Sequence, residues 1–277
     1  MSDTLSPADA LAVIPGWDAA SVSWRELEGG LTNRNYAVER GGESFVLRLD
    51  AAHTTAFNLD RTAEIEILEA ASAAGLAPEL AFADPESGIL LTRYVSGRTW
   101  SAADLDDDST IEALADLLRR VHALPTSGIE FDPMAVARGY SANLHVRHEL
   151  REFALRCEEV VATIPKIERF FCCHNDVVAA NVIARPDLML LDWEYACDNE
   201  PLFDLASLVG YHDLDRGRRS VLLSAYAGGK DPGLQERLEL QVRLYDAIQW
   251  LWLANRQLIT RSDSQAARLE ELRRRIR

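Results

Sequence analysis

The segment 170–192 is a strand-rich patch inside a second half of the chain that otherwise has helical periodicity. In that half, apolar residues recur at helical spacing in these segments: 104–123, 134–160, 202–226 and 234–259. The part before residue 95 instead combines short strand-like runs with one clear helix. A strand-rich front and a helical rear predict an α+β fold with two lobes. We expect a small strand-rich N-lobe at 1–95 and a larger, mainly helical C-lobe at 96–277.

Turn residues and alternating apolar positions indicate the elements of the first lobe. We expect a hairpin at 34–39 and 44–49 around Gly41-Gly42, a helix at 58–74, and strands near 80–83 and 89–95. Gly75, with Pro78 shortly after it, is a stop signal for that helix. The first lobe is therefore expected to hold short strands and a single helix.

Charge and cysteine content exclude several classes of partner and compartment. The formal net charge of -15 argues against nucleic acid or an acidic membrane surface, because both repel a polyanion. The four cysteines form no C-x-x-C pair, which favours reduced thiols over a metal knuckle or a disulfide scaffold. The N-terminus carries acidic residues where a secretory signal carries basic ones, and no apolar run approaches the ~20 residues of a membrane span. We expect a cytoplasmic protein.

A polar motif follows the strand-like start of the patch. His174 and Asp176 have the spacing H-x-D, and Asn181 comes five positions after the aspartate. Two short apolar runs around an Arg-Pro-Asp turn then indicate a hairpin that leads to Asp192. Phosphoryl transfer needs a base that orients the acceptor hydroxyl and oxygen ligands that hold magnesium. The spacing therefore predicts a phosphotransfer site with Asp176 as the base and with Asn181 and Asp192 as the metal ligands.

Two other interpretations of these residues were weighed. The carboxylates could simply cap turns, but the joint spacing of four residue types favours a functional site. A metal hydrolase would use His174 with the adjacent cysteines as ligands. Consecutive strand residues point to opposite faces, so Cys172 and Cys173 would not chelate one ion together. The phosphotransfer interpretation is the stronger one.

The first lobe offers an independent sign of a phosphate site. On the expected strand 44–49, Arg48 lies on the face opposite its apolar neighbours. On the following helix, Glu64 shares the apolar face of Ile67 and Ala71. A carboxylate buried without a partner is costly, so we expect Glu64 to pair with Arg48. Kinases use such a cation–glutamate pair to grip nucleotide phosphates, although a purely structural ion pair remains the alternative.

The motif H-N-D-x-x-x-x-N, together with L-D-W-E-Y, resembles the choline/ethanolamine kinase family within the aminoglycoside phosphotransferase superfamily, which has a protein-kinase-like fold. Asn175 inside the motif resembles the choline-kinase branch in particular. The resemblance extends to G-G-L-T-N-R-N-Y at 29–36 and to P-L-F-D-L-A at 201–206, and so covers most of the chain. It implies that ATP and Mg²⁺ are the cofactors.

The resemblance also implies roles for residues whose spacing alone says little. The 29–36 segment resembles the loop that covers the nucleotide, which would bring Gly30, Thr32 and Asn33 to the phosphates. A simple hairpin turn at Gly29-Gly30 is the alternative. The T-R-Y-V run at 92–95 matches the hinge between lobes, where backbone groups of Arg93 and Val95 would meet adenine. Two further residues are implied to be structural supports of the catalytic loop: His174 and Asp204.

Aromatic and acidic residues around the motif suggest the acceptor. Trp193, Glu194 and Tyr195 follow the proposed metal aspartate directly, and Trp250 and Trp252 lie on the late helix. Aromatic faces with carboxylates suit an ammonium group through cation–π and charge attraction. A Trp-rich helix is equally typical of a core. With that alternative open, we expect these residues to contact the acceptor.

The predicted activity is ATP-dependent transfer of the γ-phosphate to the hydroxyl of a small cationic alcohol, with choline or ethanolamine preferred. Thiamine, aminoglycosides and amino sugars fit the same description and remain alternatives. Two non-enzymatic alternatives also remain: a nucleotide-binding pseudokinase, which the complete Asp176, Asn181 and Asp192 set argues against, and a scaffold that binds no nucleotide.

Overall fold

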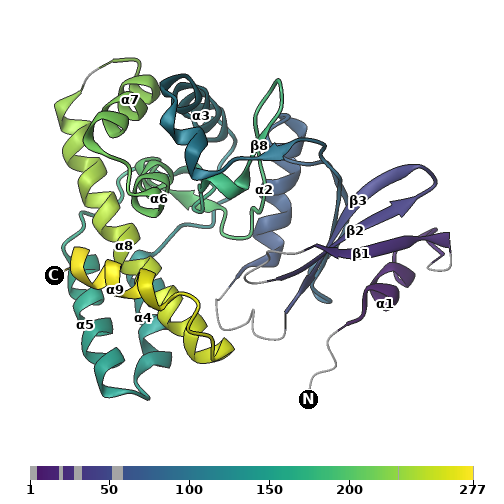
Figure 1. Ribbon diagram of the computed structural model, residues 1–277, viewed down its shortest axis with the longest axis horizontal. Coiled ribbons are helices and arrows are strands. Elements are labelled where there is room, and N and C mark those ends of the chain that lie inside the picture. The colour runs from purple at the N-terminus through teal and green to yellow at the C-terminus, as the bar shows by residue number, and fades with distance from the viewer. Residues whose placement is uncertain (1–4, 19–20, 28–32, 52–58, 230, 277) are drawn as a thin grey trace. The chain divides into compact units, whose positions relative to one another are not determined.

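The computed structural model describes residues 5–18, 21–27, 33–51, 59–229 and 231–276. Its secondary structure is mixed α+β, as predicted (Figure 1). The chain divides into two compact units. Unit 1 comprises Met1–Thr99 and Ile183–Tyr195, and unit 2 comprises Trp100–Val182 and Ala196–Arg277. The segment Ile183–Tyr195 thus belongs with the strand-rich unit, whereas the sequence assigned all of 96–277 to the helical lobe.

Pairing explains why that segment joins unit 1. A three-stranded sheet has the order β6-β8-β9, formed by β6 (Arg98–Thr99), β8 (Val182–Ala184) and β9 (Met189–Leu190). Arg98 pairs with Ala184. The Leu190 N–H also donates to the Leu76 carbonyl at 2.9 Å. These contacts lie between residues far apart in the sequence, which periodicity does not reveal.

The main sheet of unit 1 is antiparallel and has the strand order β1-β2-β3-β5-β4. Its strands are β1 (Ser23–Leu27), β2 (Asn33–Arg40), β3 (Glu43–Asp50), β4 (Leu80–Asp84) and β5 (Ile89–Arg93). The predicted β2–β3 hairpin is confirmed, and both Gly41 (φ 59°) and Gly42 (φ 85°) have the left-handed backbone that a tight hairpin turn requires. Strand β5 ends at Arg93, two residues earlier than expected.

Unit 1 also contains two helices, α1 before β1 and α2 between β3 and β4. Helix α1 (Pro7–Ala12) packs its Leu11 into one apolar cluster with Phe45 and Leu47 of β3. Helix α2 (Arg61–Ala73) corresponds to the predicted helix, although it begins three residues later than expected. Asp60 sets that beginning, because its side chain accepts hydrogen bonds from the next backbone N–H groups of the first turn. Arg48 of β3 pairs with Glu64 of α2, which links this helix to the sheet.

Unit 2 is mainly helical. Its helices are η3 (Ala102–Asp106), α3 (Asp108–Val121), α4 (Pro133–Leu144), α5 (His148–Ala162), η4 (Ala179–Asn181), α6 (Leu202–His212), α7 (Arg216–Ala227), α8 (Pro232–Thr260) and α9 (Ala266–Arg275). A short antiparallel pair joins β7 (Phe171–Cys173) to β10 (Cys197–Asn199). The long helix α8 packs against α4, α5, α6 and α9, as Figure 1 shows.

Two of the helical predictions merge what are separate helices. The expected helix 134–160 is α4 followed by α5, and the expected helix 202–226 is α6 followed by α7. The second break is produced by Asp213, which has a left-handed φ of 50°, and by Asp215, which caps α7 by accepting from the Arg218 N–H. Helical periodicity continues across such a tight corner, so the spacing of apolar residues does not show the break.

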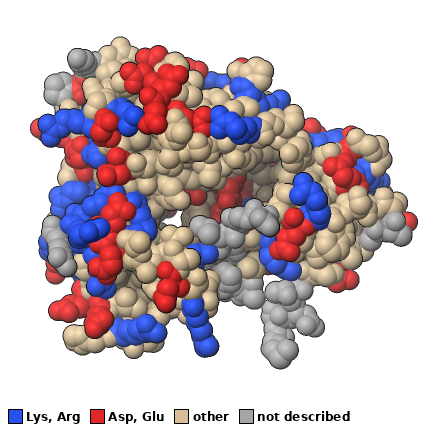
Figure 2. Space-filling view, viewed as in Figure 1, with Lys and Arg blue, Asp and Glu red and all other residues tan. Residues whose placement is uncertain are grey.

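None of the helices in the described ranges combines the length and apolar character that a membrane span requires. All four cysteines are free thiols in the structure. Figure 2 shows acidic and basic side chains interspersed over the visible face. The net charge of -15 is therefore not gathered there into one continuous acidic patch.

Candidate functional site

The loop after β7 is held by a buried carboxylate on α6. Asp204 is fully buried and accepts hydrogen bonds from the backbone N–H groups of His174 (3.0 Å) and Asn175 (2.6 Å). His122 of α3 makes a third hydrogen bond to it, at 2.9 Å. Burial alone would raise the pKa of Asp204, but these hydrogen bonds and the nearby imidazoles lower it below its usual range. The contacts suit the supporting role that the resemblance implies for Asp204.

The same loop brings Asp176 and Asn181 together. The Asn181 side-chain nitrogen donates to the Asp176 backbone carbonyl (3.0 Å) and to its carboxylate (3.1 Å). The ring of His174, which is fully buried, accepts from the Asp176 N–H at 3.3 Å. With its amide nitrogen engaged in this way, Asn181 has its amide oxygen as the atom suited to a cation.

Two further residues of α6 contact this loop, and sequence reasoning missed both. Ser207 Oγ accepts from the Val177 N–H at 3.0 Å, and His212 Nε2 accepts from the Ala179 N–H at 3.0 Å. Ser207 lies three positions after Asp204 on α6, so these two side chains share a side of that helix, and this spacing is the signal in the sequence that could have indicated Ser207. His212 is the last residue of α6, and its spacing from Asp204 gives no such signal.

His212 predicts a pH dependence of stability. Burial and the positive charge of Arg268 on α9 lower the pKa of His212 to about 4, and Tyr211 packs on the ring. An unfolded histidine has a pKa near 6.5, so the unfolded chain binds more protons between these values and stability falls as the pH falls through them. We expect His212→Gln, which retains an acceptor without titrating, to reduce this loss. Urea midpoints at about pH 7 and about pH 5 test it; equal losses in both proteins would contradict it.

In unit 1, the predicted pair of Arg48 and Glu64 is confirmed. Both guanidinium nitrogens of Arg48 contact the Glu64 carboxylate, with Nη2 at 2.7 Å from Oε2. Both residues are buried, so this is an ion pair shielded from solvent. Burial alone would raise the pKa of Glu64, but Arg48 and Arg61 lower it, and the carboxylate is therefore ionised.

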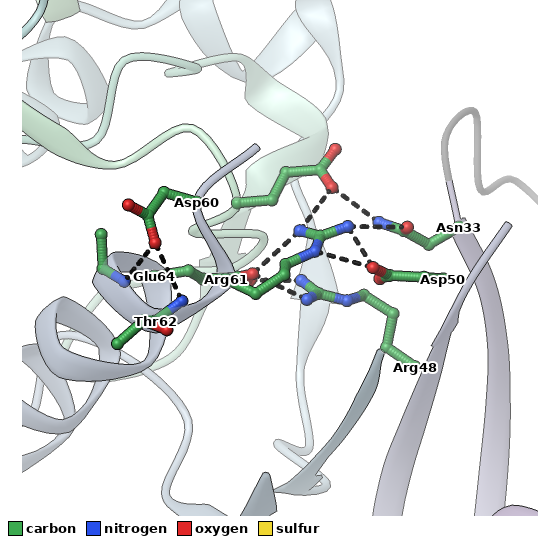
Figure 3. A network of polar contacts seen from close by, with 9 residues as sticks. Asn33, Arg48, Asp50, Asp60, Arg61, Thr62 and Glu64 are labelled. Carbon is green, nitrogen blue, oxygen red and sulfur yellow. Dashed lines mark hydrogen bonds and ion pairs between the residues drawn. The ribbon is translucent and has the colours of Figure 1, made fainter. Parts of the chain in front are cut away.

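A second arginine, which the sequence did not single out, joins the same cluster. Arg61 contacts Asp50 through two nitrogens (2.9 and 2.8 Å) and Glu64 at 2.9 Å. It also donates to Glu194 Oε2 (3.2 Å) and to Asn33 Oδ1 (3.2 Å). Figure 3 shows its guanidinium group between the side chains of Asp50, Glu64 and Asn33.

Asp192 follows β9 in the same unit. It is exposed and has a left-handed φ of 61°, which is uncommon for a residue other than glycine. Burial alone would lower the pKa of Arg48, but the negative charges of Glu64, Glu194 and Asp192 raise it. Asp192 therefore acts electrostatically on the Arg48–Glu64 pair, whereas Asp176 and Asn181 belong to unit 2.

Several residues assigned to the acceptor are placed differently from expectation. Trp250 is 0% exposed and packs on Phe153 with ring centroids 4.5 Å apart, so it belongs to the core of unit 2. Trp193 is also buried, and its Nε1 donates to the Leu190 carbonyl at 3.0 Å. Tyr195 and Trp252 are half-buried. The core alternative is therefore the correct one for Trp250, and the burial of Trp193 also departs from its expected contact with the acceptor.

Glu194 also departs from its expected role. It is buried, accepts from Asn33 Nδ2 at 2.7 Å and contacts Arg61. Asn33, expected in the nucleotide-covering loop, opens β2 and contacts Glu194 instead of solvent. The glycine-loop residues Gly30 and Thr32 lie outside the described residues.

The expected adenine contacts are backbone groups at the end of β5. The Arg93 backbone N–H donates to the Glu79 carbonyl at 2.8 Å, and its side chain pairs with Glu43 at 2.5 Å. The Arg93 N–H is thus engaged within the sheet, and the Arg93 carbonyl stays the proposed adenine contact of this residue. Val95 lies beyond the end of β5, in a segment without regular secondary structure, and stays a proposed contact.

The described residues contain one group of metal-ligating types outside the motif: His122, Cys173 and Asp204. His122 and Asp204 are hydrogen-bonded to each other, and Asp204 also holds the loop backbone. Burial raises the pKa of the Cys173 thiol well above its usual value, so the thiolate that a metal needs is disfavoured. This group is best explained as a hydrogen-bonded support.

Comparison with known proteins identifies the family of this chain. The profile of the phosphotransferase enzyme family matches residues 23–240. Protein LicA of Haemophilus influenzae is 30% identical over 207 residues, which cover 72% of this chain and 61% of LicA. The crystal structure of a choline/ethanolamine kinase family protein from Mesorhizobium loti has a TM-score of 0.74 and 25% identity, covering 97% of this chain and 92% of that one. A structure of LicA in complex with AMP has a TM-score of 0.75 and 23% identity, covering 92% and 91%.

An antiparallel sheet followed by a mainly helical unit, with the Asp176–Asn181 loop between helices, defines a kinase-like phosphotransferase fold. The chain belongs to the phosphotransferase enzyme family. The match to the chain spans about three fifths of the length of Haemophilus influenzae LicA.

Proposed function

We propose that this chain transfers the γ-phosphate of ATP to the hydroxyl group of a small cationic alcohol, and that choline or ethanolamine is the acceptor. The observation that carries the proposal is the contact between Asp176 and Asn181 on a loop braced by Asp204. A choline/ethanolamine kinase family protein and an AMP complex among the similar structures support the acceptor and the nucleotide.

In the proposed reaction, Asp176 accepts the proton of the acceptor hydroxyl. A bond forms between the hydroxyl oxygen and the γ-phosphorus, and the bond from that phosphorus to the β–γ bridging oxygen breaks, which releases ADP. Asn181 orients the Asp176 carboxylate through its side-chain amide. Such a reaction depends mainly on positioning and electrostatics.

The donor atoms fit a magnesium ion. The amide oxygen of Asn181 and the carboxylate of Asp192 are hard oxygen ligands of the type that magnesium prefers. When bound, the ion would offset negative charge on the phosphates. Asp192 and Arg48 both belong to unit 1. The negative charge of Asp192 can attract a metal ion, and the positive charge of Arg48 can attract a phosphate.

Arg48 fits a phosphate ligand. Its terminal nitrogens bind Glu64, while its Nε is buried and has no hydrogen-bond partner among the residues that the structure describes. A buried donor without a partner is uncommon, and a phosphate oxygen is a suitable acceptor for it. We therefore propose that the Arg48–Glu64 pair aligns the nucleotide phosphates.

Tyr195 and Trp252 remain the proposed aromatic contacts of the acceptor, now without Trp193 and Trp250. We also place the activity in the cytoplasm, where free thiols stay reduced.

A coupled ADP-release screen tests the acceptor. The panel contains choline, ethanolamine, thiamine, amino sugars and aminoglycosides, each with Mg²⁺ and ATP. We expect choline or ethanolamine to give the highest kcat/KM, because each joins a hydroxyl to one ammonium group. Turnover with aminoglycosides alone would contradict the acceptor and leave the phosphotransfer in place.

A further inference from the structure

Arg61 is the residue of unit 1 that joins the phosphate-binding pair to the segment carrying Asp192. It is the first residue of α2, and its side chain is 10% exposed. Its guanidinium group contacts Asp50 of β3, Glu64 of α2 and Glu194 of the segment that follows β9. Figure 3 shows the contacts with Asp50 and Glu64. Neither the sequence motif nor the proposed reaction assigns it a role.

Charge shows why this residue is needed. Arg48 and Arg61 supply two positive charges to the cluster, and Asp50, Glu64 and Glu194 supply three negative ones. The Glu64 and Glu194 side chains are each 2% exposed, so water screens them little. Without Arg61, Glu194 would keep only the amide of Asn33 among its recorded partners. The Glu194 carboxylate would then be more stable in solvent than inside the cluster.

Glu194 lies two positions after Asp192. Holding the Glu194 side chain in place therefore limits the positions that the Asp192 carboxylate can adopt. The intervening Trp193 is fixed by its hydrogen bond to the Leu190 carbonyl. Asp192 itself has a left-handed backbone, which a non-glycine residue retains only when its surroundings enforce it. Two contacts next to this residue therefore hold it: the Trp193 hydrogen bond to Leu190 and the Glu194 contact with Arg61.

We propose that Arg61 is a positioning residue for the metal ligand Asp192. It holds Glu194 against the Arg48–Glu64 pair, and thereby sets where the Asp192 carboxylate stands relative to that pair. This inference rests on the proposed function, since it deepens the role of the same site. It also assigns Glu194 to support of the metal ligand and not to the acceptor.

The fork of the guanidinium group is essential to this role. Arg61 uses Nε and Nη2 for Asp50, Nη1 for Glu64 and Glu194, and Nη2 again for Asn33. A lysine ammonium is a single point charge and cannot reach partners in all these directions. Arg61→Lys therefore keeps the charge and removes the geometry, which separates positioning from simple charge balance.

The experiment compares Arg61→Lys with Arg40→Lys. Arg40 is a matched control in the same unit, where it donates to the Gly16 carbonyl and stacks on Trp17. The first readout is hydrogen exchange of the backbone amides at 191–195 in protein free of nucleotide and metal. The second is the Mg²⁺ concentration at half-maximal activity with ATP and the best acceptor of the ADP-release screen, measured beside the KM of that acceptor.

We expect Arg61→Lys to accelerate exchange at 191–195 and to raise the half-maximal Mg²⁺ concentration by about 10- to 100-fold. Substitution of a residue that supports a metal ligand usually weakens metal binding by this factor. The acceptor KM and all Arg40→Lys values should stay near wild type. Should Arg61→Lys fail to fold, Glu194→Gln is read by the same measurements with the same expectation, because it weakens the tether from the other end.

A folded Arg61→Lys protein with wild-type exchange and wild-type Mg²⁺ dependence would overturn the inference. A rise in the acceptor KM without a change in Mg²⁺ dependence would also overturn it, because Glu194 would then serve the acceptor. If the wild-type chain consumes no ATP with any acceptor, the proposed function fails instead. The exchange result at 191–195 still reports whether Arg61 holds that segment.

Discussion

Asp176→Asn is expected to lower kcat by about 10²- to 10⁴-fold, the usual contribution of a positioned general base. Asparagine has nearly the shape of aspartate, but it cannot accept the proton of the acceptor hydroxyl. Its amide also removes the charge that the Asn181 side chain contacts at 3.1 Å. Because Asp204 holds the loop through the backbone of the neighbouring residues, the fold should be retained. Steady-state ADP release with the best acceptor measures the effect.

Two controls accompany this variant. Asp187→Asn changes an exposed aspartate in the turn between β8 and β9 and should leave kcat near wild type. A thermal shift with Mg²⁺ and ATP should be similar in wild type and Asp176→Asn, because a ligand that binds the native state stabilises it whether or not turnover occurs. A kcat within a few-fold of wild type in Asp176→Asn would remove Asp176 from the role of base.

Glu64→Gln is expected to reduce the free energy of unfolding by about 3–5 kcal/mol, which is typical when one partner of a buried ion pair is lost. Glu64 is 2% exposed and is the recorded partner of both terminal nitrogens of Arg48. The neutral amide would leave the Arg48 charge buried without a counter-ion in direct contact. Urea denaturation at neutral pH measures the loss.

Glu66→Gln is the matched control, because Glu66 lies on the exposed side of the same helix and should change stability by less than about 0.5 kcal/mol. The pH dependence adds a second check. The pKa of Glu64 is below its ordinary 4.5, so its contribution is complete above that value and is lost as the pH falls further. The free energies of unfolding of Glu64→Gln and Glu66→Gln should therefore converge in acid. Equal stability of Glu64→Gln and Glu66→Gln at neutral pH would contradict the account.

The contrast between Arg48 and Arg61 shows what the sequence can reveal. The Arg48–Glu64 pair was predictable because strand alternation and helix periodicity each put one charge on a defined face. Arg61 pairs with Glu194 across 133 positions, and Asp50 ends a strand where alternation no longer assigns a face. Contacts of that kind depend on how chain segments meet in three dimensions.

The late helix α8 shows where the sequence pattern does not distinguish a core residue from a pocket residue. Trp250 and Trp252 lie two positions apart on α8, yet the first is 0% exposed and the second is half-buried. The composition of such a helix is compatible with both a core and a ligand pocket, and only packing against Phe153 separates the two. In contrast, Asp176 and Asn181 were found from spacing alone, because residues so close in sequence are brought together by one loop.

The most direct test is phosphoryl transfer from ATP to choline, followed by ³¹P NMR with the purified wild-type chain and Asp176→Asn. We expect the γ-phosphate resonance to be replaced by a phosphomonoester resonance and ADP in equal amounts, only with Mg²⁺, and far more slowly in Asp176→Asn than in the wild type. The same experiment with ethanolamine covers the second preferred acceptor. Absence of a phosphorylated product with every acceptor of the panel, or equal product formation by Asp176→Asn, would contradict it.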